Sequence, residues 1–249
     1  LISISSKVRE KGTEIIEFSF FELKKYINLK SKHSNVEFMK NIKKPKLIIF
    51  TGPSGVGKGT VEKELFNNPS LKLKLSVSVT TRQPREGEID GIHYYFVSQD
   101  TFDACLADNK LIEYSLHFDN YYGTLYSEID RIIAQGKIPF LEIETNGATQ
   151  VIDYYKKHKK VDEIVSIFLM PPSFSELEKR IIRRNTEPEE VIKKRLAKAK
   201  QEVGQANLFQ YIVISDTVPQ TVREIEKIIK NEFSDLLNQK EEQSEGRKA

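Results

Sequence analysis

The sequence predicts an α/β fold in which helices cover both faces of a parallel sheet. Short runs that are apolar at nearly every position recur along the chain, and segments with helical periodicity separate them. Strands of this kind are typical of parallel sheets that are buried on both faces. The length of 249 residues suits one such domain with insertions, or at most two small domains.

The first half of the chain contains two predicted strands and two predicted helices. The run "KLIIF" predicts a buried strand at 46–50, and a helix is expected over 58–66, after a glycine-rich loop. In "LKLKLSVSV", at 71–79, residues alternate with period two, which is typical of a half-buried strand. The second helix is expected to start near Ser127 and to end at Gly136.

The second half continues this alternation of strands and helices. Strands are predicted at 138–144 ("IPFLEIE") and at 164–170 ("IVSIFLM"), where two prolines end the second strand. The remaining expected elements are a helix from about 173, a long helix from about 188 to 209, the strand "YIVI" and a last helix from about 219.

Composition narrows the class of protein. Apolar residues make up 39% of the chain and charged residues 30%, as in a soluble globular protein. The net charge of +3 is too weak to suggest a nucleic-acid partner, and no run of 18 apolar residues predicts a membrane span. The single cysteine cannot form an internal disulfide and fits a reducing environment, so we expect a cytoplasmic location. The oligomeric state is left open.

The two ends of the chain differ from its middle. Residues 1–43 mix charges of both signs with short apolar clusters and do not form a secretory signal. We predict an N-terminal extension that is either non-native or disordered, in which case the functional polypeptide starts at Met39; a genuine amphipathic appendage is the alternative. Residues 233–249 are predicted to be a polar C-terminal tail.

The segment "GPSGVGKGT" has the spacing G-x-x-x-x-G-K of a phosphate-binding loop. A glycine-rich turn between a strand and a helix exposes backbone N–H groups, and the helix N-terminus and Lys58 add positive charge. The loop is therefore predicted to bind a nucleoside triphosphate. Gly59 stands where Ser or Thr is usual, but Thr60 supplies a hydroxyl beside it. The predicted loop residues are Gly52, Pro53, Ser54, Gly55, Val56, Gly57, Lys58, Gly59 and Thr60.

A second candidate anion site follows the strand predicted at 71–79. Arg82 and Arg85 lie three residues apart in "TTRQPR", and Pro84 between them favours an extended turn over a helix. Both guanidinium groups can therefore converge on one anion. Planar, bidentate donors suit a phosphate group particularly well.

These motifs make the chain similar to the guanylate kinase family, whose members phosphorylate GMP. The resemblance runs from about 46 to 232 and rests on "GPSGVGKGT", "SVSVTTRQPREGEIDGIHYYFV", "NYYGT", "LEIETNGA" and "RIIRRNTEPEEVIKKR". It implies a three-layer P-loop NTPase core with a parallel sheet, an inserted mixed α/β lobe that binds GMP, and a helical lid over ATP. The matching domain would span 44–232, with its core at 44–77, 128–179 and 197–232, the lobe at 78–127 and the lid at 180–196.

The resemblance also implies which residues contact GMP. The 5′-phosphate would be held by Arg82, Arg85, Tyr94 and Tyr122. The guanine would be surrounded by Ser78, Glu113, Thr124 and Glu144. Guanine presents N1–H and N2–H₂ side by side, and one carboxylate such as Glu113 can accept from both. Adenine would place an acceptor against that carboxylate, so the assignment favours guanine.

The lid and the metal are implied in the same way. The catalytic groups would be Lys58 and the lid arginines Arg180, Arg184 and Arg195, which neutralise charge on the transferred phosphoryl group. Mg²⁺ would be bound through the nucleotide phosphates, with Thr60 and Glu142 as candidates to hold it through water. No general base is needed, because the phosphate of GMP is already an anionic nucleophile.

The expected function is therefore the transfer of the γ-phosphate of ATP to GMP, with dGMP as a further substrate, in purine nucleotide metabolism. Two alternatives stay open: a catalytically inactive guanylate-kinase-like module that binds proteins, and a nucleoside monophosphate kinase with another base preference. The intact Lys58 and the lid arginines argue against the first, and Glu113 together with "TTRQPR" argues against the second.

Overall fold

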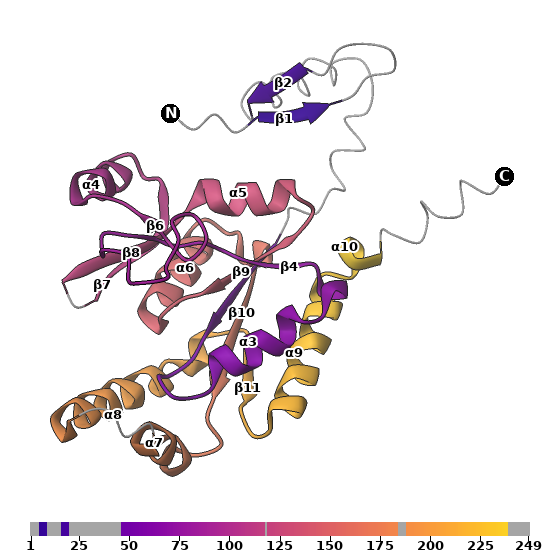
Figure 1. Ribbon diagram of the computed structural model, residues 1–249. Helices are drawn as coiled ribbons and strands as arrows, with labels where there is room; N and C mark the ends of the chain where they lie inside the picture. The colour runs from indigo at the N-terminus through magenta and orange to yellow at the C-terminus, as the bar shows by residue number, and fades with distance from the viewer. Residues whose placement is uncertain (1–4, 9–15, 20–45, 118, 184–187, 239–249) are drawn as a thin grey trace. The chain divides into compact units, whose positions relative to one another are not determined.

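The computed structural model describes residues 5–8, 16–19, 46–117, 119–183 and 188–238 (Figure 1). The chain divides into two units, 1–44 and 45–249. In the first unit, strands β1 (Ser5–Val8) and β2 (Ile16–Ser19) pair in antiparallel fashion. The rest of the predicted N-terminal extension, including Met39, lies outside the described residues.

The second unit is built on a parallel sheet of five strands, as the sequence predicts. The strand order is β11-β10-β3-β9-β4, and every neighbouring pair is parallel. The strands are β3 (Leu47–Thr51), β4 (Leu73–Leu75), β9 (Ile138–Glu142), β10 (Ile164–Met170) and β11 (Tyr211–Ile214). The bounds of β10 and β11 match the predicted strands, because each is a short apolar run with polar or turn-forming residues on both sides.

Helices cover both faces of this sheet and form the other two layers (Figure 1). Ile48 and Phe50 of β3 belong to a core cluster that α3 (Lys58–Phe66) and α9 (Val218–Glu232) complete. Leu47 and Ile49 belong to a second cluster, with α5 (Tyr126–Ala134) and α6 (Thr145–Lys157). Successive residues of one strand point to opposite faces, so the apolar run in β3 needs apolar partners on both. The predicted three-layer core is confirmed.

A second, smaller sheet is inserted between β4 and α5. Its order is β6-β5-β8-β7, in which β5 and β6 are parallel and the other pairs are antiparallel. It contains β5 (Val79–Thr80), β6 (Tyr95–Phe96), β7 (Leu111–His117) and β8 (Asn120–Leu125), with α4 (Gln99–Ala107) beside them. This mixed sheet occupies the segment where the inserted lobe was predicted.

The single strand predicted over 71–79 is wrong. The short 3₁₀ turn Pro69–Leu71 comes first, then β4 of the large sheet, and β5 already belongs to the small sheet. Between them, the backbone N–H of Ser76 donates to Phe140 and that of Val77 donates to the carboxylate of Glu128. Burial also differs on the two sides of this change, since Lys74 and Leu75 are exposed whereas Val79 and Thr80 are buried, so the period-two pattern does not mark one half-buried strand.

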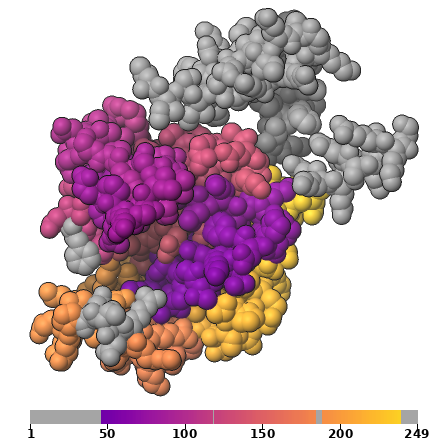
Figure 2. Space-filling view, viewed as in Figure 1, coloured from indigo at the N-terminus to yellow at the C-terminus, as the bar shows by residue number. Residues whose placement is uncertain are grey.

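The predicted lid, 180–196, takes in the end of α7 (Phe174–Arg183) and the first half of α8 (Glu189–Gly204), and residues 184–187 between the helices lie outside the described part. Figure 2 shows the two helices as adjoining orange regions of the surface. Helix α8 ends at Gly204, earlier than predicted, and a 3₁₀ turn (Ala206–Leu208) follows.

The packed region extends past Glu232, where the polar tail was predicted to begin. Phe233 is buried in the core, and Leu236 and Leu237 of the short helix α10 (Ser234–Asn238) pack against the same cluster. The remainder of the predicted tail, 239–249, lies outside the described residues. Among the helices that the structure describes, none has the length and apolar character needed to cross a bilayer.

Candidate active site

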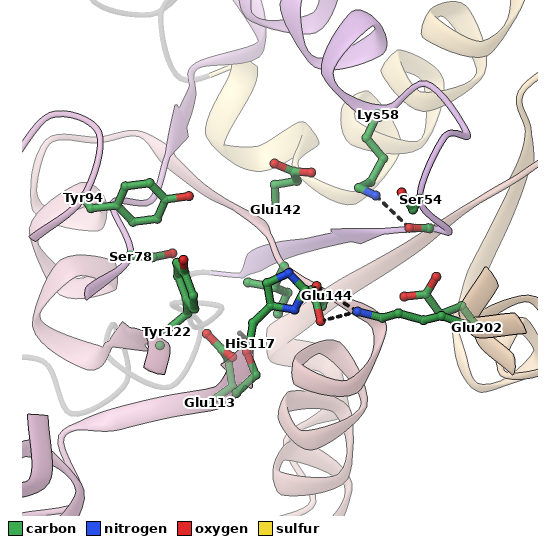
Figure 3. Close-up of a pocket in the computed structure, with 15 residues that line it drawn as sticks. Ser54, Lys58, Ser78, Tyr94, Glu113, His117, Tyr122, Glu142, Glu144 and Glu202 are labelled. Atoms are coloured by element: carbon green, nitrogen blue, oxygen red, sulfur yellow. Dashed lines mark hydrogen bonds and ion pairs between the residues drawn. The ribbon is translucent and has the colours of Figure 1, made fainter. Parts of the chain in front are cut away.

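A cavity of about 360 Å³ opens where the carboxyl end of the parallel sheet meets the small sheet. Its lining comes from the glycine-rich loop, from β7 and β8, from the end of β9 and from α8. Lys58 and Ser54 lie toward one end of the cavity and Tyr94 toward the other, with Glu144 between them (Figure 3). Parallel sheets of this type bind ligands at this edge.

The glycine-rich loop has the backbone geometry that its sequence predicts. Gly55 and Gly57 have φ angles of 87° and 107°, values that side-chain-bearing residues rarely adopt. A Cβ at Gly55 would also lie 2.8 Å from Cγ1 of Ile181, so this position needs glycine for a second reason. Helix α3 begins directly at Lys58, whose Nζ donates to the carbonyl of Gly52 at 2.7 Å. The loop and its lysine therefore form one compact, positively charged nest.

Two of the three predicted lid arginines contact this loop. Nη1 of Arg180 donates to the carbonyl of Val56 at 3.2 Å, and its Nη2 donates to the carbonyl of Ser215 at 3.3 Å. Nη2 of Arg195, in α8, donates to Oγ of Ser54 at 2.8 Å. Arg184, the third, lies outside the described residues. The structure thus brings two guanidinium groups from the lid helices to the loop.

The small sheet gathers most of the residues predicted to hold the GMP phosphate. The guanidinium of Arg82 lies 5.3 Å from the ring centroid of Tyr94, and the Tyr94 and Tyr122 rings are 5.9 Å apart. Arg82 is not free, because it forms a bidentate ion pair with Glu88 at 2.9 and 3.0 Å. The Arg82 hydrogen bonds hold the pKa of Glu88 at about 2. The side chain of Arg85 is exposed, and its backbone N–H also donates to Glu88.

Glu113 is a buried carboxyl that faces the cavity, with only 5% of its surface exposed. The hydroxyl of Thr124, fully buried, donates to its Oε1 at 2.7 Å, so Thr124 acts on the site through Glu113. Oε2 lies against the first turn of α6, where a Cβ at Gly147 would be only 2.6 Å away. Burial raises the pKa of Glu113 to about 7, and the charge of Glu144 adds to this shift while the Thr124 hydrogen bond opposes it.

Glu144 lies at the entrance of α6 and lines the same cavity, as does Ser78. Nζ of Lys198, in α8, donates to both Glu144 oxygens at 3.0 and 2.9 Å. His117, which sequence reasoning did not select, lies 3.6 Å from Glu144 through Nδ1. The lysine was missed as well, because no local motif marks a residue that reaches the site only through tertiary packing.

The acidic residues near Lys58 fit a divalent cation. Glu142 lines the cavity at the end of β9, and in nearby α3 the Oε1 atom of Glu62 is buried without a partner among the described residues. Burial raises the pKa of Glu62 to about 8, with a further contribution from the charge of Glu142. A cation beside these carboxyl groups would relieve both effects. The described residues contain no cluster of three or more acidic, His or Cys ligands, which is compatible with Mg²⁺ because this ion keeps waters and phosphate oxygens as ligands.

Comparison with known proteins identifies relatives of the chain. A family model described as guanylate kinase matches residues 44–232. Guanylate kinases of Mycoplasmopsis synoviae (strain 53) and Mycoplasmopsis pulmonis (strain UAB CTIP) are each 51% identical to the chain. The alignments cover 78% and 77% of this chain and 98% and 97% of those proteins. The crystal structure of guanylate kinase from Anaplasma phagocytophilum superposes with a TM-score of 0.56 at 28% identity, covering 76% of this chain and 86% of that one.

Proposed function

The chain belongs to the guanylate kinase family and is an ATP-dependent GMP phosphotransferase, and we propose that its cavity holds the two substrates from opposite ends. The observation that carries this proposal is that one cavity joins the glycine-rich loop and Lys58 to the buried carboxyl of Glu113. The loop suits a polyphosphate, and a buried carboxyl beside a hydroxyl suits a base with adjacent N–H donors.

GMP is proposed to bind at the small sheet. Glu113 accepts from N1–H and N2–H₂ of the guanine, with Ser78 and Glu144 at the same end of the cavity. Thr124 fixes the orientation of the Glu113 carboxyl, since its hydroxyl occupies Oε1 in the free protein. For the 5′-phosphate we propose Arg82, Arg85, Tyr94 and Tyr122. Arg82 is held in place by Glu88 and lies near the Tyr94 ring, so its guanidinium is already positioned when the phosphate arrives.

ATP is proposed to bind at the glycine-rich loop, residues 52–60. Lys58 and the lid arginines at present donate to protein acceptors: the carbonyls of Gly52 and Val56, and the hydroxyl of Ser54. Phosphate oxygens are charged acceptors and form stronger hydrogen bonds than these neutral groups. The triphosphate therefore replaces these contacts, and Lys58, Arg180 and Arg195 neutralise the charge that develops during transfer, with Arg184 as the third lid arginine.

Mg²⁺, when bound with ATP, screens the negative charge of the phosphate groups. We propose that Glu142 holds the ion through water, with Thr60 as a further oxygen donor near the loop. The phosphate of GMP needs no general base, so the protein contributes position and charge rather than proton transfer. Burial of the substrates by the lid helices would exclude water from the transferred group.

A substrate panel tests the proposed function against its alternatives. GMP, dGMP, AMP and UMP would each be assayed with ATP and Mg²⁺ by coupled detection of ADP. We expect turnover of GMP and dGMP, and losses of roughly 10²–10⁴ in kcat/KM for AMP and UMP, because two charged hydrogen bonds to the base are lost. Turnover of none of them would favour an inactive binding module, and preference for AMP or UMP would favour another base specificity.

The Glu142→Gln variant is expected to raise the Mg²⁺ concentration that gives half-maximal rate by about tenfold, because the amide cannot orient metal-bound water as a carboxylate does. Initial rates at fixed ATP over a series of Mg²⁺ concentrations would measure this. Glu64→Gln is the matched control, since Glu64 is exposed on α3. An unchanged Mg²⁺ requirement in the Glu142 variant would show that Glu142 has no role toward the metal.

A variant that begins at Met39 is expected to keep nearly full turnover, because every proposed site residue follows Pro45. Turnover of GMP and the melting temperature would be compared with those of the full chain. A large fall in either quantity would show that residues 1–38 stabilise the catalytic unit. We propose a cytoplasmic location, where ATP and GMP are available and where the single cysteine would stay reduced.

A further inference from the structure

Lys198 reaches the cavity from α8 and donates to the carboxylate of Glu144, which the proposed function assigns to guanine. Its Nζ lies 3.0 and 2.9 Å from the two oxygens of Glu144, so both oxygens are engaged. The two side chains are each 40% exposed. An ion pair with this exposure is weak, and one partner can be exchanged readily. A guanine that approaches Glu144 would therefore compete with Lys198 for the same acceptor.

Glu202 offers Lys198 a second acceptor on the same helix. It lies four residues further along α8, and side chains at this spacing are neighbours on a helix surface. Glu202 as a whole is 8% exposed and lines the cavity, and its Oε2 is buried without a hydrogen-bond partner among the described residues. Burial raises the pKa of Glu202, and the charge of Lys198 is the largest influence that opposes this shift. A buried carboxylate without a partner gains free energy when a cation pairs with it.

Glu202 is also connected to the phosphate-binding loop. The backbone N–H of Ser54, in this loop, favours the ionised form of Glu202 and so lowers its pKa. Arg195, from the same helix, donates to Oγ of Ser54 at 2.8 Å. Helix α8 therefore contacts the guanine side of the cavity through Lys198 and the loop side through Glu202 and Arg195.

We propose that Lys198 is a positioning residue that couples the two substrate sites. When guanine donors occupy Glu144, Lys198 leaves that carboxylate and pairs with Oε2 of Glu202. The ionised Glu202 then accepts more strongly from the N–H of Ser54, which fixes the loop for ATP. Because coupling between two binding sites is reciprocal, ATP at the loop also favours GMP in the cavity. The inference rests on the proposed function, since it needs Glu144 to contact the base.

The test is the effect of GMP on the affinity for a non-hydrolysable ATP analogue with Mg²⁺, measured by calorimetry. In the unaltered protein, saturating GMP is expected to tighten analogue binding about fivefold or more. In Lys198→Met, which keeps the length of the side chain and removes its charge, this factor should fall close to one. The Kd for GMP alone should change by less than about fivefold, because the exposed ion pair contributes little.

Lys200→Met is the matched control, because Lys200 is an exposed lysine of the same helix and loses the same charge. It should keep the full effect of GMP on the analogue. The inference would be overturned if GMP still tightened binding of the analogue in Lys198→Met. It would also be overturned if Lys200→Met lost the effect of GMP to the same extent, or if GMP did not change the affinity of the unaltered protein for the analogue. Failure of the unaltered protein to bind GMP at all would instead contradict the proposed function.

A second measurement separates a structural role of Lys198 from the proposed exchange of partners. The carboxyl ¹³C resonance of Glu202, assigned by its loss in Glu202→Gln, would be titrated with and without GMP. GMP is expected to lower the pKa of Glu202 in the unaltered protein, because Lys198 arrives beside it, and to leave it unchanged in Lys198→Met. A pKa that GMP does not lower in the unaltered protein would overturn the exchange.

Discussion

Lys58→Ala is expected to abolish phosphoryl transfer while GMP binding survives. Nζ of Lys58 lies at the glycine-rich loop, 2.7 Å from the carbonyl of Gly52, whereas the proposed GMP contacts come from the small sheet, its loops and the start of α6. Removing one preorganised donor to a developing negative charge costs about 10²–10³ in kcat, and the loss of a full positive charge should exceed this. Single-turnover kinetics would give the rate, and calorimetry the Kd for GMP.

Lys63→Ala is a suitable control for this variant, because Lys63 is an exposed lysine of the same helix and lies in its last turn. It should retain the rate and the GMP affinity of the unaltered protein. If GMP affinity disappeared together with activity in Lys58→Ala, the proposed division of the cavity into two substrate ends would be wrong. A melting temperature within a few degrees of that of the unaltered protein would show that the variant is folded.

Glu113→Gln is expected to lower kcat/KM for GMP by roughly 10²-fold or more, equivalent to about 2.7 kcal/mol at 1.36 kcal/mol per decade. The glutamine can keep its carbonyl oxygen at the position of Oε1, where Thr124 donates. The amide nitrogen then replaces Oε2, so a donor faces a donor of the base. IMP lacks the 2-amino group and already lacks one of these hydrogen bonds, so the fall in kcat/KM for IMP should be smaller.

The comparison of GMP with IMP decides what Glu113 does. Equal losses for the two nucleotides would identify Glu113 as a structural carboxyl, and guanine recognition would then depend on Ser78 and Glu144. Thr124→Val serves as the matched variant, because it removes the hydroxyl that donates to Glu113 and leaves the carboxyl in place. We expect it to weaken GMP binding less than Glu113→Gln does, since it affects only the orientation of the carboxyl.

The pH dependence of GMP binding gives a second readout for Glu113. Burial raises the pKa of this carboxyl to about 7, and only the ionised form can accept from both guanine donors. Between pH 8 and pH 6 its ionised fraction falls from about nine-tenths to about one-tenth, so the Kd for GMP should rise about tenfold. GMP itself titrates near pH 6. This ionisation affects the Kd for GMP in both proteins. The difference in pH dependence between the unaltered protein and Glu113→Gln therefore reports on the Glu113 carboxyl alone.

The same carboxyl affects stability with a definite sign. The pKa of Glu113 is higher in the folded protein than in the unfolded chain, so the folded state favours the protonated form. Its contribution to stability is fully present below about pH 4.5 and is lost as the pH rises toward about 7. From pH 4.5 to pH 8 the unaltered protein should thus lose up to about 3 kcal/mol relative to Glu113→Gln. Denaturant unfolding at several pH values would measure this difference.

Features that depend on contiguous residues could be predicted from the sequence. The predicted helix over 58–66 and the strand at 164–170 have the same bounds in the structure. The loop between β3 and α3 could be identified because its glycines, its lysine and the start of the following helix all lie within nine consecutive residues. The parallel sheet followed from apolar runs such as that of β3, which only a sheet covered on both faces can bury.

Other features depend on which segments become neighbours, and the sequence does not specify these. The division of 71–79 between two sheets follows from pairing with β9 on one side and with β6 and β8 on the other. The burial of Glu113 depends on close approach to Gly147 in α6. Lys198 and Glu202 enter the cavity because α8 packs beside it.

The sequence by itself thus determined the fold class and the glycine-rich loop between β3 and α3, because local patterns encode turns, charge and burial. The tertiary structure alone decided which charges meet. It pairs Arg82 with Glu88, engages Glu144 with Lys198 and leaves one oxygen of Glu202 without a partner among the described residues. The physical reason is that the strength of a charge–charge contact depends on distance and burial, and these are set by packing between segments that are far apart along the chain.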